Sequence, residues 1–127
     1  MTFIENIYQK FKETYNAGNW SEYEIAGGKV ALSPSLTEAI VYTDGRYPTI
    51  LEGYQVNDTI TETEKTLWGI AVIELADPFE VVTVKEGDSY SFKPGRPYSI
   101  SGKCVSYITM DKPWDSKQKH YLLKDTQ

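Results

Sequence analysis

The chain has 127 residues, of which 40% are hydrophobic and 24% charged, a composition typical of one folded domain. Its net charge of −5 and its lack of a basic stripe argue against a nucleic-acid partner, because phosphate binding requires clustered lysines and arginines. The single cysteine, Cys104, excludes an intramolecular disulfide framework and a cysteine-rich zinc site, and its apolar neighbours predict a buried, inert thiol.

The N-terminal segment predicts an amphipathic helix over residues 2–16. Apolar side chains recur there at three- and four-residue steps, at Phe3, Ile4, Ile7, Phe11 and Tyr15. Thr2 and Glu5 have the spacing of a capping box at the start of a helix. The apolar stripe fits packing on the rest of the chain, which is the commoner arrangement, or on a partner protein.

The same segment does not resemble a signal peptide, because it lacks a basic start followed by an apolar block. Nowhere does the chain approach the run of about 20 apolar residues that a membrane span requires. We therefore expect a cytoplasmic protein without a membrane partner.

Short β-rich runs separated by turn residues follow the helix. They are KVALS, EAIVYT, TILEGYQV, TLWGIAVIEL, FEVVTV, SYSF, YSIS and CVSYITM. Eight such runs predict a mainly β protein, a jelly-roll barrel over about residues 28–110. The nearly continuous apolar run LWGIAVIEL predicts a strand buried on both faces. In the tail, residues 111–127, we expect the segment 120–124 to pack back on the barrel or on a second subunit.

Residues 84–102, VKEGDSYSFKPGRPYSISG, carry a family resemblance. They resemble the second conserved motif of cupins, with Gly87 and Gly95 at its two glycine positions and Pro94 one residue late. Tyr98 stands where that motif has a metal-binding histidine. The turns Gly87-Asp88 and Pro94-Gly95 also make physical sense alone, because glycine permits the positive φ that such turns require.

A weaker match to the first cupin motif begins at Gly53. It places Thr59 and Thr61 at two histidine positions and Lys65 or Thr66 at the glutamate position. The chain is thus similar to small single-domain cupins over about residues 29–115, and the resemblance implies a cupin-like barrel after the N-terminal helix. From the chain length we expect a single domain, residues 1–127.

The resemblance also implies a metal held by three histidines and a carboxylate, but this sequence has none of the four at the matching positions. The only histidine, His120, lies outside both motifs. Glu62 and Glu64 alternate with threonine, a pattern typical of a solvated strand edge. We therefore expect no metal and no cofactor.

We expect instead a small-molecule site at the barrel mouth, where the family holds its metal. The candidate ligand-binding residues are Tyr98, Arg96, Thr59, Thr61, Lys65, Trp68, Tyr54, Tyr107 and Arg46. The aromatic residues among them suit ring stacking, although packing is their commoner use. The arginines suit a carboxylate or a phosphate, although a solvated turn charge is the simpler interpretation for each. Alternation along CVSYITM separates Tyr107 from Ile108 but leaves open which face points inward.

The expected function is metal-independent binding of a sugar, a nucleotide or a small anionic metabolite, for sensing or sequestration. Two alternatives stay open. One is a metal-free sugar isomerase or epimerase, which would draw on His120 with Tyr98 or Tyr107. The other is a dimeric protein-interaction module, because small cupin barrels commonly form homodimers. We expect binding rather than catalysis, and a homodimer.

Overall fold

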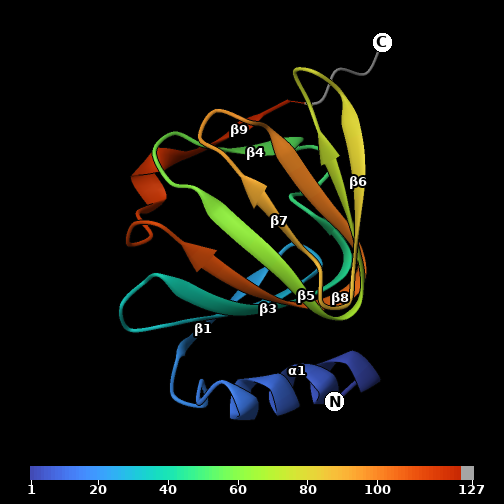
Figure 1. Ribbon diagram of the computed structural model, residues 1–127, viewed down its shortest axis with the longest axis vertical. Coiled ribbons are helices and arrows are strands. Elements are labelled where there is room, and N and C mark those ends of the chain that lie inside the picture. The colour runs from blue at the N-terminus through green and yellow to red at the C-terminus, as the bar shows by residue number, and fades with distance from the viewer. Residues whose placement is uncertain (124–127) are drawn as a thin grey trace.

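The computed structural model describes residues 1–123 as one helix followed by a curled sheet (Figure 1). The elements in chain order are α1 (Phe3–Thr14), β1 (Ser21–Ile25), β2 (Gly28–Leu32), β3 (Glu38–Tyr47), β4 (Tyr54–Asn57), β5 (Glu62–Leu75), β6 (Glu80–Lys85), β7 (Ser89–Phe92), β8 (Tyr98–Met110), the 3-10 helix η1 (Ser116–Gln118) and β9 (Lys119–Leu122). The predicted mainly β fold with an N-terminal helix is confirmed.

Strand β8 is the centre of the sheet. It pairs with β3, β4 and β5, all antiparallel. Strands β2 and β1 extend the sheet from β3, β6 and β7 pair with β5, and β9 pairs with β4. Two of these strands, β1 and β9, were not among the predicted runs, whereas YSIS and CVSYITM run together as β8. The segment 120–122 does pack back on the barrel, and Lys124 lies outside the described residues.

A bulge in β5 decides which of its side chains face the interior. The register against β8 shifts between Thr66 and Trp68. Before the shift the even-numbered residues are buried, and after it Ala71, Ile73 and Leu75 are buried. An extra residue in one strand reverses the side-chain parity beyond it. The prediction that this run is buried on both faces is wrong, because Ile70 on the outer face is 49% exposed.

Helix α1 lies across the outside of the barrel, next to β3 and β8 (Figure 1). The predicted capping box is present, with Thr2 and Glu5 each bonding the other's backbone N–H. Ile4 and Tyr8 are buried against Ile40 and Val105 of the barrel. The apolar stripe therefore packs within the chain. No helix among residues 1–123 is long and apolar enough to cross a membrane.

The two turns of the resemblance adopt the expected backbone. Gly87 has φ of 87° and Gly95 has φ of 83°, both in the left-handed region that glycine occupies without a steric penalty. These turns bracket β7 and deliver the chain to Tyr98 at the start of β8. The local geometry of residues 84–102 therefore positions Tyr98 at one end of the barrel interior.

Candidate functional site

The barrel interior is filled on one side and open on the other. Apolar side chains from β5, β6, β7 and β8 pack the filled side, among them Ile73, Leu75, Phe92 and Cys104. The open side is a cavity of about 690 Å³ between β1, β2, β3 and β8, a volume in the range of small-molecule sites. Its apolar wall consists of Ile25, Val30, Leu32, Leu36, Ala39, Val41, Ile100, Ile108, Met110 and Trp114.

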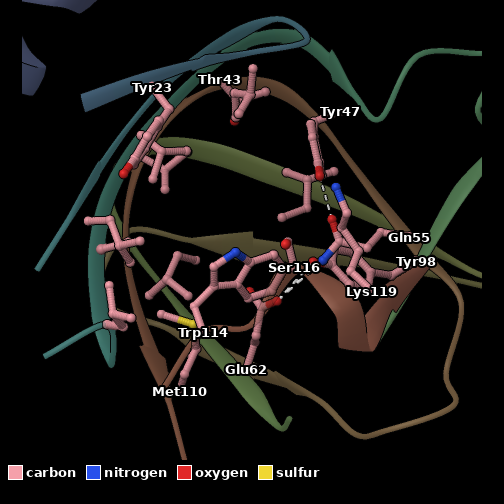
Figure 2. A pocket seen from close by; sticks show the side chains of 18 of the residues that line it. Tyr23, Thr43, Tyr47, Gln55, Glu62, Tyr98, Met110, Trp114, Ser116 and Lys119 are labelled. Carbon is pink, nitrogen blue, oxygen red and sulfur yellow. Dashed lines mark hydrogen bonds between the residues drawn. The ribbon is translucent and has the colours of Figure 1, made fainter. Parts of the chain in front are cut away.

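Polar side chains gather at one end of this cavity. Figure 2 shows Tyr47, Gln55, Tyr98 and Lys119 grouped on one side of the cavity, which Glu62 and Trp114 also line. The Tyr47 hydroxyl donates to Gln55 Oε1. Gln55 Nε2 and the Tyr98 hydroxyl each lie 3.4 Å from Glu62 Oε1, to which both donate. The cavity is therefore apolar along its length and polar at one end.

A layer of amides behind this end fixes the orientation of Glu62. Asn57 Nδ2 donates to Glu62 Oε1 over 2.7 Å. Asn57 Oδ1 in turn accepts from Gln55 Nε2 and from Gln118 Nε2, each at 3.1 Å. Asn57 is 1% exposed and Gln118 is 7% exposed, so these bonds are shielded from water. Strands β4 and β5 and the turn η1 are thus tied together around one carboxyl group.

Glu62 is buried, which corrects the interpretation of Glu62 and Glu64 as a solvated strand edge. The two residues are 9% and 0% exposed. Burial raises the pKa of Glu62, because the charged form loses its hydration, while the hydrogen bonds from Asn57 and Tyr98 lower it. Burial and the nearby Glu62 carboxyl likewise raise the pKa of Tyr98 well above its ordinary range. The uncharged forms of both groups are therefore favoured in the cavity.

Glu64 lies two residues farther along the same strand and forms a separate buried site. Its Oε2 accepts from Ser106 Oγ at 2.6 Å and from Thr66 Oγ1 at 2.8 Å. Its Oε1 is buried and has no hydrogen-bond partner among residues 1–123. Burial raises the pKa of Glu64 as well. Glu64 is not among the described residues that line the cavity, so it serves as a natural comparison for Glu62.

Of the nine predicted ligand-binding residues, Tyr98 alone is among the described residues of the cavity wall. It packs against Phe92 with ring centroids 4.1 Å apart, so its ring is fixed while its hydroxyl reaches Glu62. The inward face of β8 is the one that carries Ile108 and Met110. This settles the alternation of CVSYITM, which the sequence left open.

Three predicted aromatic residues lie elsewhere. Trp68 packs under α1 with its ring 5.9 Å from that of Phe3. Tyr107 also faces the helix, where it stacks on Tyr15 at 4.6 Å and donates to Glu38. The Tyr54 hydroxyl donates to Glu74 over 2.8 Å. These three rings pack the protein rather than line the cavity.

The predicted cations and threonines are also outside the wall. Arg46 donates to the backbone oxygens of Pro48 and Gly53, and Arg96 pairs with Glu80 at 3.2 Å. Lys65 is exposed on β5. In the loop before β5, the N–H of Thr59 donates to Gln118 Oε1 and that of Thr61 donates to Asp111 Oδ1. Whether any of these residues contacts a ligand stays a prediction, but the geometry does not bring them to the cavity.

Four of the wall residues that sequence reasoning missed show why the site was hard to predict. Tyr23 and Ile25 belong to β1, whose sequence SEYEI did not match a buried strand. Gln55 and Glu62 belong to polar alternations, and alternation shows only that residues share a face. For Glu62 the available signal was that ETEKT continues directly into the apolar run LWGIAVIEL on the same strand.

The residues described do not form the donor set that a metal-binding cupin uses. Among residues 1–123 there is no group of three histidine, cysteine, aspartate or glutamate side chains that could hold a metal ion. His120 is exposed, with Nδ1 3.1 Å from Asp58 Oδ1 on the outside of the barrel. Glu62 Oε1 instead accepts hydrogen bonds from three side chains, and donors of this kind stabilise an oxygen acceptor but do not help it to bind a cation.

Comparison with known proteins defines the class of fold. No protein-family model and no curated protein sequence matches the chain. Among solved structures, Pac13 from Streptomyces, a nucleoside dehydratase solved with uridine, superposes with a TM-score of 0.72 at 14% identity, covering 84% of this chain and 87% of that one. Oxalate decarboxylase from Bacillus subtilis superposes with a TM-score of 0.66 at 17% identity, covering 84% of this chain and 31% of that one.

These similarities show that the chain has a cupin-like β-barrel fold, as the motif of residues 84–102 predicted. By their names, one neighbour is a nucleoside dehydratase and the other an oxalate decarboxylase.

Proposed function

We propose that the barrel cavity binds an uncharged small molecule that carries a ring, and that it does so without a metal. The observation that carries this proposal is the polar group of Tyr47, Gln55, Glu62 and Tyr98 at one end of an otherwise apolar cavity of about 690 Å³. Sites for small molecules commonly combine an apolar wall with a few polar groups that set the orientation of the ligand. The ring would contact the wall, and its polar edge would meet Glu62.

The charges of the wall favour an uncharged ligand over a phosphorylated one. The described wall contains two carboxyl groups, Glu62 and Asp115, and one cation, Lys119. Lys119 Nζ is already held by the Tyr121 hydroxyl at 3.0 Å. Arg46 and Arg96, which suit phosphate, donate to other groups of the protein. A phosphate in this cavity would lose its hydration without a matching set of cations.

A nucleoside is the first candidate within this class. It carries a planar base with carbonyl and amide edges and a sugar with hydroxyls, which matches an apolar wall with one polar end. The structural similarity to Pac13, which has been solved with uridine, supports the choice of uridine as a probe. In this role the ligand would be sensed or sequestered, and its binding would raise the stability of the folded state.

Calorimetric titration with uridine and with uridine monophosphate tests the proposal. We expect uridine to bind and the monophosphate to bind more weakly. Ile108→Trp, which fills the cavity from β8, should abolish binding. The matched control is Ile70→Trp on the exposed outer face of β5, which should leave the affinity unchanged. If uridine and other uncharged ring compounds fail to bind, or if Ile108→Trp binds as well as wild type, the proposal is wrong.

Metal-free acid–base catalysis is a second candidate, favoured by one observation. Glu62 and Tyr98, two groups able to exchange protons, meet at the cavity end. His120, the histidine expected in the isomerase alternative, lies outside the cavity wall, so acid–base catalysis at this site would use Glu62 and Tyr98 without it. Recovery of incubated uridine in altered form, with loss of that change in Glu62→Gln, would support an enzyme. The dimeric module stays a prediction, which light scattering on the purified protein tests.

A further inference from the structure

The two oxygens of the Glu62 carboxyl are in different surroundings. Oε1 accepts from Asn57 Nδ2 at 2.7 Å and from Gln55 Nε2 and the Tyr98 hydroxyl at 3.4 Å each. None of the hydrogen bonds in the described part of the chain reaches Oε2. Oε2 is not a buried atom without a partner either, which means that it is in contact with open space. Because Glu62 lines the cavity, this oxygen faces the cavity. One oxygen is therefore committed to the protein, and the other is directed at a ligand.

This asymmetry fixes where a proton can sit. A neutral carboxyl carries its proton on one oxygen, which then donates a hydrogen bond, while the other oxygen only accepts. A proton on Oε1 would point at three groups that already donate to it. We propose that Glu62 is protonated on Oε2 and donates this hydrogen into the cavity, where it recognises a carbonyl-type oxygen of the ligand. This inference rests on the proposed function and narrows its ligand class.

The groups around Glu62 favour this neutral donor form. Tyr47 from β3 and Tyr98 from β8 stay protonated, because burial raises the pKa of each phenol. From β9, Lys119 lies over the ring of Tyr121, 4.7 Å from its centroid, and makes no ion pair with Glu62 within the described residues.

The remaining titratable groups near Glu62 are acidic. Asp115 lines the cavity from the turn before η1, and Glu64 follows Glu62 on the inward face of β5. The surroundings therefore offer hydrogen-bond donors to Oε1 but no counter-ion to Oε2.

Calorimetric titration with uridine between about pH 5 and pH 8 tests the donor role. The affinity of the wild type should fall by about tenfold for each pH unit above the pKa of Glu62, because only the protonated form binds. Glu62→Gln should bind within about threefold of the low-pH wild type and show a flat profile, because its amide N–H takes the place of the Oε2 hydrogen. Glu64→Gln, the matched control on the same strand, should keep the wild-type profile.

Infrared spectroscopy of the ligand-free protein asks the same question without a ligand. A carbonyl stretch of a protonated carboxyl, present in the wild type at the low end of the pH series and missing from Glu62→Gln, supports the inference even if uridine does not bind. If the band is present but uridine does not bind, the nucleoside proposal is wrong and the donor role of Glu62 is still supported. If this band is missing from the wild type at the low end of the pH series, if the affinity stays constant across the pH range in which the band disappears, or if Glu62→Gln loses binding at low pH, the donor role is wrong.

Discussion

Asn57 Nδ2 lies 2.7 Å from Glu62 Oε1, and both side chains are buried at the polar end of the barrel cavity. This bond joins the end of β4 to the start of β5. Through Asn57 Oδ1 it also connects to Gln55 and Gln118. A buried hydrogen-bond network in which each member has partners holds its groups in one geometry. Removing one member leaves the others with unsatisfied hydrogen-bonding groups. Asn57 is therefore the residue that positions Glu62.

Replacing Asn57 by alanine should lower the free energy of unfolding by about 2 kcal/mol, because Gln55, Glu62 and Gln118 each lose a buried partner. The same change should raise the pKa of Glu62 further, since a hydrogen bond that lowers it is gone. Urea denaturation measures the first effect. Asn6→Ala on the exposed side of α1 is the control, with a change within about 0.5 kcal/mol. Equal stability of both variants would show that the network is not needed.

The stability of the protein should decrease as pH rises because of Glu62 and Glu64. Each has a pKa raised by burial, so each binds its proton more tightly in the folded state. Their contribution is fully present below the ordinary pKa of 4.5 and is lost as pH rises through the raised value.

Urea denaturation of wild type, Glu62→Gln and Glu64→Gln across a pH series measures this loss. Relative to wild type, each variant should become more stable with rising pH, by about 1.4 kcal/mol for each unit by which folding raises that pKa. The difference between variant and wild type removes the contributions of other carboxyl groups. Differences that stay constant across the series would mean that neither carboxyl has a raised pKa.

The sequence predicted the fold better than the site, and a physical reason accounts for this. Glycine positions and turn residues constrain the backbone locally, so Gly87 and Gly95 identified the turns around β7. Which face of a strand points inward depends on pairing with distant strands. The bulge at Leu67 reverses that choice along β5, and the residues before it do not reveal it. The alternation of Glu62 with threonine likewise fits a solvated edge, although Glu62 lies inside the barrel.

Two tryptophans have opposite expected roles. Trp114 lines the cavity, and its backbone N–H donates to the oxygen of Leu36, another wall residue, over 2.7 Å. Trp68 packs under α1. Trp114→Ala should weaken uridine binding by about tenfold, the effect expected on losing a stacking surface. Trp68→Ala should leave the affinity unchanged and lower the free energy of unfolding by about 3 kcal/mol.

Calorimetry and urea denaturation of both tryptophan variants separate binding from stability. If Trp68→Ala weakens uridine binding while its fold is intact, the prediction that Trp68 contacts the ligand regains support. If Trp114→Ala binds uridine as well as wild type, the ring does not lie against Trp114.

Cys104 should be unreactive in the folded protein. It is fully buried in the filled side of the barrel, where burial raises the pKa of its thiol to about 11. Since the thiolate is the reactive form, a thiol reagent at neutral pH should modify Cys104 only after urea unfolds the chain. The rate of labelling with an aromatic disulfide measures this. Rapid labelling without urea would mean that the filled side opens in the native state.

The most direct test of the central claim is a titration of the isotope-labelled protein with uridine, followed by two-dimensional NMR. The account predicts that shift changes gather at the cavity wall, at Tyr47, Ile108 and the indole of Trp114. Helix α1 and the turns that hold Arg46 and Arg96 should stay unchanged. Shift changes confined to those turns, or their absence with uridine and with other uncharged ring compounds, would contradict a ligand site inside the barrel.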